Sequence, residues 1–188
     1  MCMHRRALRT LLERYLAVWP GEHAVVARFL AFVEGHEHCL LRSCGPGHIT
    51  ASAWVVNSEW SCSLLTHHKK LGKWLQLGGH VDGESEVERA CLREAQEESG
   101  MLDFAFVPWA GDAITPLDLD VHLIPARGGE AGHLHWDVRF LLQAAPGQAL
   151  VVSAESNKLA WVPDDRLSEY TSEESVLRMH RKAAEVRR

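Results

Sequence analysis

A glycine turn followed by a charged helix occupies residues 78–101, which read GGHVDGESEVERACLREAQEESGM. The helix is predicted over residues 85–99, because apolar side chains recur there at intervals of four residues. Its apolar stripe consists of Val87, Cys91 and Ala95. Ser85, with Glu88 three residues later, fits a capping box and is the predicted N-cap. Any fold of this chain must therefore place this helix with one side against a core.

Three acids share one side of the predicted helix, directly beside its apolar stripe. Glu94, Glu97 and Glu98 fall within an arc of about 100° in helical geometry. Like charges at such spacings repel by about 0.2–0.5 kcal/mol per pair, and unpaired carboxylates near a core cost more. Arg93, one turn from Glu97, can neutralise one acid. Clustered carboxylate oxygens suit Mg²⁺ or Mn²⁺, and a solvated helix face laced with arginine is the alternative.

Composition narrows the class of protein. The chain has 188 residues, of which 46% are hydrophobic and 24% charged, as in one globular domain. Its net charge of −5 argues against binding to a nucleic-acid polymer, but allows a small phosphorylated substrate if a cation bridges the two. Its five cysteines lack CxxC spacing and indicate reduced thiols. With neither a secretory signal nor a membrane-spanning stretch, the expected location is cytoplasmic.

The remaining elements are predicted from hydrophobic periodicity. Helices are expected over residues 4–18, 22–34 and 172–186, and strands over 48–57, 60–68, 73–79, 118–126, 133–144 and 158–163. Strands on both sides of the central helix, with helices at the two ends, predict an α/β fold. Its sheet would be mixed, with helices against it, rather than a regular βαβ array.

The glycine turn and the acids together resemble the Nudix box. In that signature a Gly is followed by five residues, a Glu, seven residues and then Arg-Glu-aliphatic-x-Glu-Glu-x-Gly-aliphatic. Gly79 and the run REAQEESGM, which begins fourteen positions later at Arg93, match it. Ser85 departs from it, because the family has Glu at that position and Glu84 is out of register. The GGHVDG opening and the preceding GHITASAW are similar to a bacterial branch of the family, and the likeness covers residues 45–188.

This resemblance implies a Nudix-type α/β/α sandwich with a mixed sheet at residues 45–188, preceded by an N-terminal helical extension at residues 1–44. It also implies a hydrolase that cleaves a diphosphate linkage, in a nucleoside diphosphate derivative or another nucleotide, with Mg²⁺ or Mn²⁺. By position in the box, the metal ligands would be the carbonyl of Gly78 and the side chains of Glu94, Glu97 and Glu98. Arg93 would orient these acids.

Several alternatives stay open beside this interpretation. The general base could be a box glutamate, or Glu155 or Glu130 from loops elsewhere. A diphosphate isomerase on the same fold would need a catalytic cysteine in its own motif, which no cysteine here occupies. A non-catalytic nucleotide-sensing module usually lacks box acids, whereas Arg93 and the three glutamates are all present. The N-terminal helices could cap the cleft or form the interface of a homodimer.

A polar strand face forms a second group of candidates. Residues His133, His135, Asp137 and Arg139 alternate along one strand and therefore share a face, and Asp120 and His122 repeat the pattern on the strand before. Arg139, His133 and His135 could contact substrate phosphate or ribose. An internally hydrogen-bonded face and a zinc site are the other readings. The zinc-capable side chains of residues 36–48, His48 included, lack paired zinc-site spacing, so turn and core roles are predicted for them.

Overall fold

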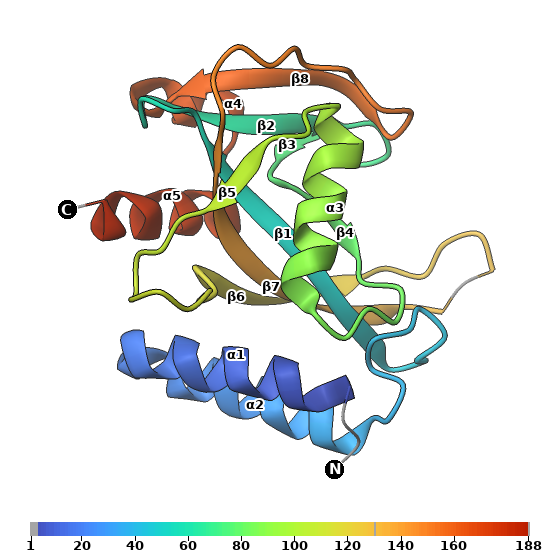
Figure 1. The fold of residues 1–188 in the computed structure, drawn as a ribbon. Coiled ribbons are helices and arrows are strands. Elements are labelled where there is room, and N and C mark those ends of the chain that lie inside the picture. The colour runs from blue at the N-terminus through green and yellow to red at the C-terminus, as the bar shows by residue number, and fades with distance from the viewer. Residues whose placement is uncertain (1–3, 130, 188) are drawn as a thin grey trace.

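The computed structural model describes residues 4–129 and 131–187. Its strands form a single sheet (Figure 1). They are β1 (Gly47–Val56), β2 (Cys62–His68), β3 (Lys73–Leu75), β4 (Leu77–His80), β5 (Phe104–Phe106), β6 (Asp118–Ile124), β7 (His133–Ala144) and β8 (Ser156–Pro163). The helical elements are α1 (His4–Val18), η1 (Pro20–Glu22), α2 (His23–Gly35), α3 (Val87–Ser99), η2 (Asp164–Arg166), α4 (Leu167–Tyr170) and α5 (Glu174–Val186).

Strand directions within the sheet are mixed, as the sequence predicts. The central pair, β1 and β7, is parallel and has His48 opposite His135. β1 also pairs antiparallel with β2 and β4, while β7 pairs antiparallel with β5 and β6. The predicted strand over residues 73–79 is two strands, because β3 pairs with β2 whereas β4 pairs with β1. The three-residue strand β5 was not predicted from the sequence.

Alternation along the central strands places two apolar clusters on opposite faces of the sheet. One face packs against α1, α2 and α3 through side chains such as Ile49 and Val138. The other face packs against α5, where Trp54 and Leu141 meet Met179. Helices therefore cover both faces, and the predicted α/β fold with helices before the sheet is confirmed.

The two N-terminal helices belong to the first of these clusters. Phe29 and Phe32 of α2 pack on Trp136 of β7, with ring centroids 5.2 and 4.4 Å away. The first helix is also tied to the last one, because the Lys182 ammonium of α5 donates a hydrogen bond of 2.6 Å to the Tyr15 hydroxyl of α1. A boundary at residue 44 stays a prediction. Among the described helices, none is long and apolar enough to cross a membrane.

Candidate active site

The glycine turn lies where β4 passes between β1 and α3. A Cβ on Gly78 would lie 2.6 Å from the Ala51 carbonyl oxygen, and the φ of Gly78 is +147°, a region that favours glycine. A Cβ on Gly79 would lie 2.7 Å from the carboxylate carbon of Glu94. The two glycines therefore let the strand approach both its neighbouring strand and the acids of the helix.

The helix lies as its periodicity predicts, but begins later. Val87, Cys91 and Ala95 are fully buried, so the apolar stripe is confirmed. The predicted N-cap at Ser85 is wrong: α3 begins at Val87, and its N-cap is Glu86, which makes no side-chain cap bond. The physical reason is that the Arg89 amide, which would donate to the Ser85 carbonyl if Ser85 were the N-cap, donates to the Glu86 carbonyl instead.

Glu84, the acid beside the family's missing glutamate, has a local partner. Its carboxylate accepts a hydrogen bond of 3.2 Å from the Glu86 amide. The side chain thus holds the loop immediately before the helix.

Glu98 is the most deeply buried of the three box acids, with 7% of its surface exposed. Its carboxylate accepts a hydrogen bond of 2.9 Å from the Gly78 amide. Burial raises the pKa of Glu98 to about 7, against this hydrogen bond, and the charge of Glu94 adds to the rise. Burial also raises the pKa of Glu94, although Arg93 opposes the shift. Two acids are therefore held close together where ionisation is costly.

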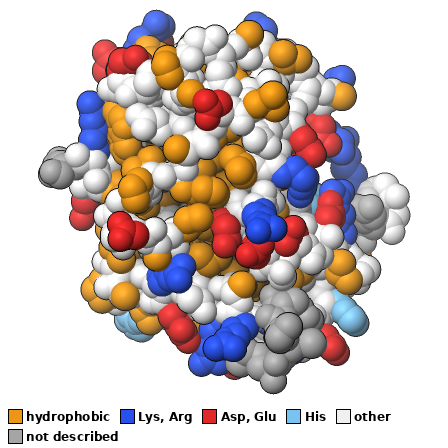
Figure 2. All heavy atoms as spheres, in the orientation of Figure 1, with side chains coloured by type: hydrophobic (Ala, Val, Ile, Leu, Met, Phe, Trp, Pro, Cys, Tyr) orange, Lys and Arg blue, Asp and Glu red, His pale blue; other side chains and the backbone are white. Residues whose placement is uncertain are grey.

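Arg93 connects the other two acids to the glycine turn. Its guanidinium donates to Glu94 at 2.7 Å, to Glu97 at 3.3 Å and to the His80 carbonyl at 2.8 Å. The Glu97 side chain is 60% exposed, so this acid faces solvent beside the buried pair. In the view of Figure 2, acidic and basic side chains lie next to one another over part of α3. The arginine thus fixes the orientation of Glu94.

Of the two loop acids predicted as candidate bases, Glu155 lies within electrostatic range of the box acids. Its negative charge raises the pKa of both Glu94 and Glu98. The backbone carbonyl of Glu155 accepts a hydrogen bond of 2.9 Å from the Lys69 amide, which positions its loop. The other candidate, Glu130, lies outside the described residues.

Arg139 lies in a different environment from the one expected of a substrate ligand. It is 1% exposed, and its guanidinium donates to Asp137 at 2.7 Å, Asp118 at 3.1 Å and Asp120 at 3.0 Å. Burial opposes ionisation of Asp120, but hydrogen bonds and charges from His122, Arg139 and Arg178 hold its pKa well below its usual range. This placement favours a structural role for Arg139 over contact with substrate.

His133 and His135 lie apart from Arg139, nearer the start of β7, where they meet a residue that sequence analysis had assigned to a turn or core role. His48 of β1 lies with its ring centroid 5.0 Å from that of His133 and 4.7 Å from that of His135. The periodicity of β7 predicted a shared face for its own histidines. The same periodicity could not predict that β1, which carries His48, pairs beside β7.

The donor set at the glycine turn fits a hard divalent cation. The acids Glu94 and Glu98 are crowded, partly or fully buried, and raised in pKa, with Arg93 as their only ion-pair partner among the described residues. Such carboxylates gain more from a bound cation than exposed ones do, because the cation replaces lost hydration. Carboxylate and carbonyl oxygens are the ligands that Mg²⁺ and Mn²⁺ prefer.

The fold and the box define a class of hydrolases that act on acid anhydrides. A model of the NUDIX domain matches residues 46–181, and the chain therefore belongs to the Nudix family. It is a hydrolase that acts on acid anhydrides. No curated protein matches the chain.

Solved structures agree with this assignment. A NUDIX-family hydrolase from Clostridium perfringens is 25% identical with a TM-score of 0.59, over 75% of this chain and 98% of that one. A MutT NUDIX hydrolase from Burkholderia pseudomallei is 26% identical with a TM-score of 0.52, over 70% and 94%. An Ap4A hydrolase from C. elegans, at 15% identity and a TM-score of 0.57 over 72% and 94%, shares the fold.

Proposed function

We propose that this chain hydrolyses the diphosphate linkage of a nucleoside diphosphate derivative with Mg²⁺ or Mn²⁺ as cofactor. The cation ligands in this proposal are the Gly78 carbonyl and the carboxylates of Glu94, Glu97 and Glu98. One observation supports it above others: Glu98 is buried and bonded to the Gly78 amide, with Glu94 close enough to raise its pKa. A solvated, purely structural helix face would not bury two acids in this way.

The chain's own residues give the site its shape and charge. Arg93 holds Glu94 and Glu97 through ion pairs of 2.7 and 3.3 Å, and its bond to the His80 carbonyl anchors both acids to β4. Glu98 loses its proton near neutral pH, so the site reaches its full negative charge in that range. When bound, the cation would neutralise phosphate oxygens and lower the pKa of a water molecule.

Proton removal from the attacking water is assigned to a carboxylate. Glu155 is our first candidate, because it is exposed and its charge reaches both Glu94 and Glu98. In the reaction, water oxygen attacks one phosphorus, the bond from that phosphorus to the bridging oxygen breaks, and the carboxylate accepts the water proton. A box glutamate is the alternative base. Comparing pH–rate profiles of Glu155→Gln and wild type separates the two assignments.

The sequence left two alternatives to hydrolysis open, a nucleotide-sensing module and a diphosphate isomerase. The sensing role is less well supported because Arg93 and all three box acids are present and placed around the glycine turn. An isomerase would need a catalytic cysteine in its own motif. Cys39 and Cys91 are fully buried, burial raises their pKa values, and the half-buried Cys62 lies outside the box on β2. The homodimer and the cytoplasmic location stay predictions.

A substrate panel tests the proposal. It would contain nucleoside diphosphate sugars, dinucleoside polyphosphates, ADP-ribose, NADH, and ribo- and deoxyribonucleoside triphosphates, each assayed with Mg²⁺ and with Mn²⁺. Release of a nucleoside monophosphate, dependent on the added cation and stopped by a chelator, is the expected result. Binding of a panel member without turnover would favour the sensing module, and isomerised product without hydrolysis would favour the isomerase.

A further inference from the structure

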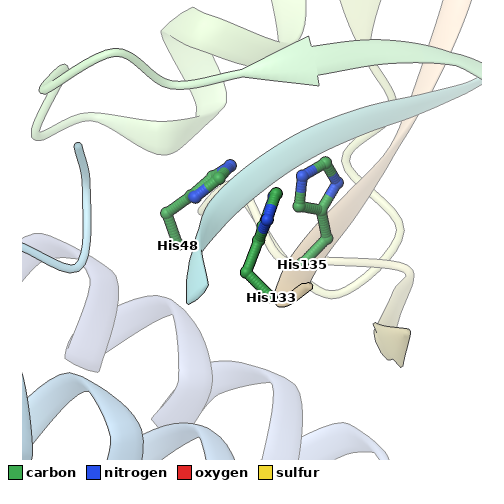
Figure 3. Close-up of side chains that lie close together, drawn as sticks. All are labelled: His48, His133 and His135. Atoms are coloured by element: carbon green, nitrogen blue, oxygen red, sulfur yellow. The ribbon is translucent and has the colours of Figure 1, made fainter. Parts of the chain in front are cut away.

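Three histidines gather on one face of the sheet, away from the box acids. His48 and His135 stand opposite each other on the parallel strands β1 and β7, and His133 precedes His135 by two residues on the same face. Figure 3 shows the three side chains rising from the two strands on the same side, with their rings next to one another. One ligand atom from each lies within 4.8 Å of the other two.

The imidazole ring of His48 is buried with its polar atoms unpaired among the described residues. It is 3% exposed, and both of its ring nitrogens are buried without a hydrogen-bond partner among the described residues. A neutral imidazole always has one N–H donor and one acceptor nitrogen. Leaving such groups buried and unpaired costs about 1–3 kcal/mol each. A metal ion that binds the lone pair of the acceptor nitrogen would offset part of that cost.

His133 is already oriented in the way that metal-binding histidines are. Its Nδ1 lies 3.1 Å from the Ala131 carbonyl oxygen, so Nδ1 carries the proton and Nε2 is left as the acceptor. A hydrogen bond from one ring nitrogen to a backbone carbonyl is the usual support for a ligand bound by the other nitrogen. The Ala131 carbonyl therefore sets the tautomer that a metal would require.

We propose that His48, His133 and His135 form a second metal site, separate from the box, that takes a transition-metal ion of the Zn²⁺ type. Imidazole nitrogens are ligands for zinc and its neighbours, whereas Mg²⁺ prefers oxygen. If the three ring nitrogens lie 4.8 Å from one another, each lies about 2.8 Å from the centre of their triangle. A movement of each ring by about 0.7 Å toward that centre would give a Zn–N distance of about 2.1 Å. Side-chain rotation alone can supply a movement of this size.

Two further histidines lie at the edge of this site. The ring of His80 lies 5.0 Å from that of His48 and 5.2 Å from that of His135, and the ring of His122 lies 5.4 Å from that of His135. Three protein ligands leave one position open to water, and His80 is the nearest side chain that could occupy it instead. Because Arg93 holds the His80 carbonyl, a metal here would also stiffen the end of β4 beside the glycine turn.

Uncharged rings are the form that binds a metal and the form that this site favours. Burial lowers the pKa of His48 to about 4 and that of His80 below its ordinary value. Three ring nitrogens within 4.8 Å of one another can point their lone pairs at a single cation, so this geometry favours a cation as the ligand.

The test uses the full chain, without a histidine tag and stripped of metal by a chelator. Zn²⁺ is titrated calorimetrically and Co²⁺ by its visible absorption, both with excess Mg²⁺ present to occupy the box. We expect one equivalent to bind, and His48→Gln or His133→Gln to weaken the affinity at least about tenfold, because each removes a ligand. Glu98→Gln, which alters the box, and His38→Gln, which removes an exposed histidine elsewhere, should bind as wild type does.

Three results would overturn the proposal. The first is no stoichiometric binding by the wild-type chain. The second is wild-type affinity in His133→Gln, a half-buried position where the substitution leaves the core intact. The third is loss of binding in Glu98→Gln, which would place the ion at the box. Far-UV circular dichroism checks every variant, and if His48→Gln does not fold, His133→Gln decides.

Discussion

Gly78 and Glu98, twenty positions apart in the chain, are joined by a hydrogen bond of 2.9 Å from the glycine amide to the glutamate carboxylate. This bond is the most direct link between the glycine turn and the acid helix. It favours the ionised carboxylate, while burial favours the protonated one, and burial has the larger effect. Glu98 is consequently a functional candidate that costs stability at neutral pH.

The first prediction follows from that cost and concerns stability against pH without divalent cations. The pKa of Glu98 is about 7 in the fold and about 4.5 in the unfolded chain. Between these values the folded state holds more protons, so the Glu98 contribution to stability falls as pH rises and is constant above about pH 7. Glu98→Gln removes this loss.

Relative to wild type, Glu98→Gln should therefore gain stability between pH 5 and pH 8, by up to about 1.4 kcal/mol per pH unit. Urea unfolding at both pH values measures this change. The matched control is Glu174→Gln, an exposed acid on α5, whose effect should not vary with pH in this way. A stability difference for Glu98→Gln that is equal at pH 5 and pH 8 would contradict the assignment.

A second prediction separates the two glycines. Gly78→Ala should destabilise the fold by more than about 2 kcal/mol, because the new Cβ meets backbone atoms of β1 at a positive φ. Gly79→Ala should cost less stability, since its Cβ meets the end of the Glu94 side chain, but should lower activity by displacing that acid.

Thermal unfolding and turnover, measured on both glycine variants, test this contrast. Gly45→Ala is the control, because no atom lies within 4 Å of the added Cβ, and its stability should change by less than about 1 kcal/mol. If Gly79→Ala lost stability and kept activity while Gly78→Ala did the reverse, the described packing of β4 would be wrong.

The third prediction concerns the buried arginine. Arg139→Met should destabilise the protein by about 3–5 kcal/mol, because Asp137 would stay buried without its ion-pair partner, while Asp118 keeps Arg178 and Lys182. Arg166→Met breaks an exposed pair with Glu169 and should leave the stability close to that of wild type. Urea unfolding compares the two. A variant at Arg139 that folds normally but binds substrate poorly would restore the substrate-binding interpretation.

Local sequence was enough to predict the helix and its acids. The apolar stripe at intervals of four places Val87, Cys91 and Ala95 in the core, and helical geometry then places Glu98 beside it. The helix begins later than its cap chemistry predicts, because the loop before Val87 uses the Glu84 carboxylate and not the Ser85 side chain. Cap chemistry alone does not reveal which of two adjacent polar residues the loop uses.

Contacts between distant strands could not be predicted in the same manner. His48 meets His135 only because β1 and β7 pair in parallel, across more than 80 positions of sequence. Periodicity states which residues share a face, but not which strand lies alongside. Likewise, alternation put Arg139 on a polar face, whereas its burial depends on α5, whose Ser175 carbonyl accepts one of its hydrogen bonds at 3.2 Å.

The fourth prediction concerns His48 in the metal-free protein. Its pKa is lowered by burial and by the nearby charges of His80, His133 and Arg42, against the opposing charge of Asp82. As pH drops, His48 is therefore protonated in the unfolded chain before it is protonated in the folded protein. The His48 contribution to the free energy of unfolding consequently falls between about pH 6.5 and about pH 4, by up to about 1.4 kcal/mol per pH unit.

His48→Gln should reduce this loss, so its stability relative to wild type should improve as pH falls from about 6.5 to about 4. The variant and wild type are compared by urea unfolding at pH 4.5 and pH 7 with a chelator present. The comparison must be between variants, because Glu98 acts in the opposite direction over much of the same range. A stability difference that does not depend on pH would contradict the burial of an uncharged His48 ring.

Turnover of the best panel substrate with Mg²⁺ by wild type, Glu97→Gln and Glu98→Gln tests whether the box acids hold the catalytic cation. Both variants should fold and lose at least about 100-fold in turnover, because each removes a proposed metal ligand. Glu174→Gln, the surface control, should stay near wild type. Near-full Mg²⁺-dependent turnover in both box variants would contradict the assignment of Glu97 and Glu98 as metal ligands.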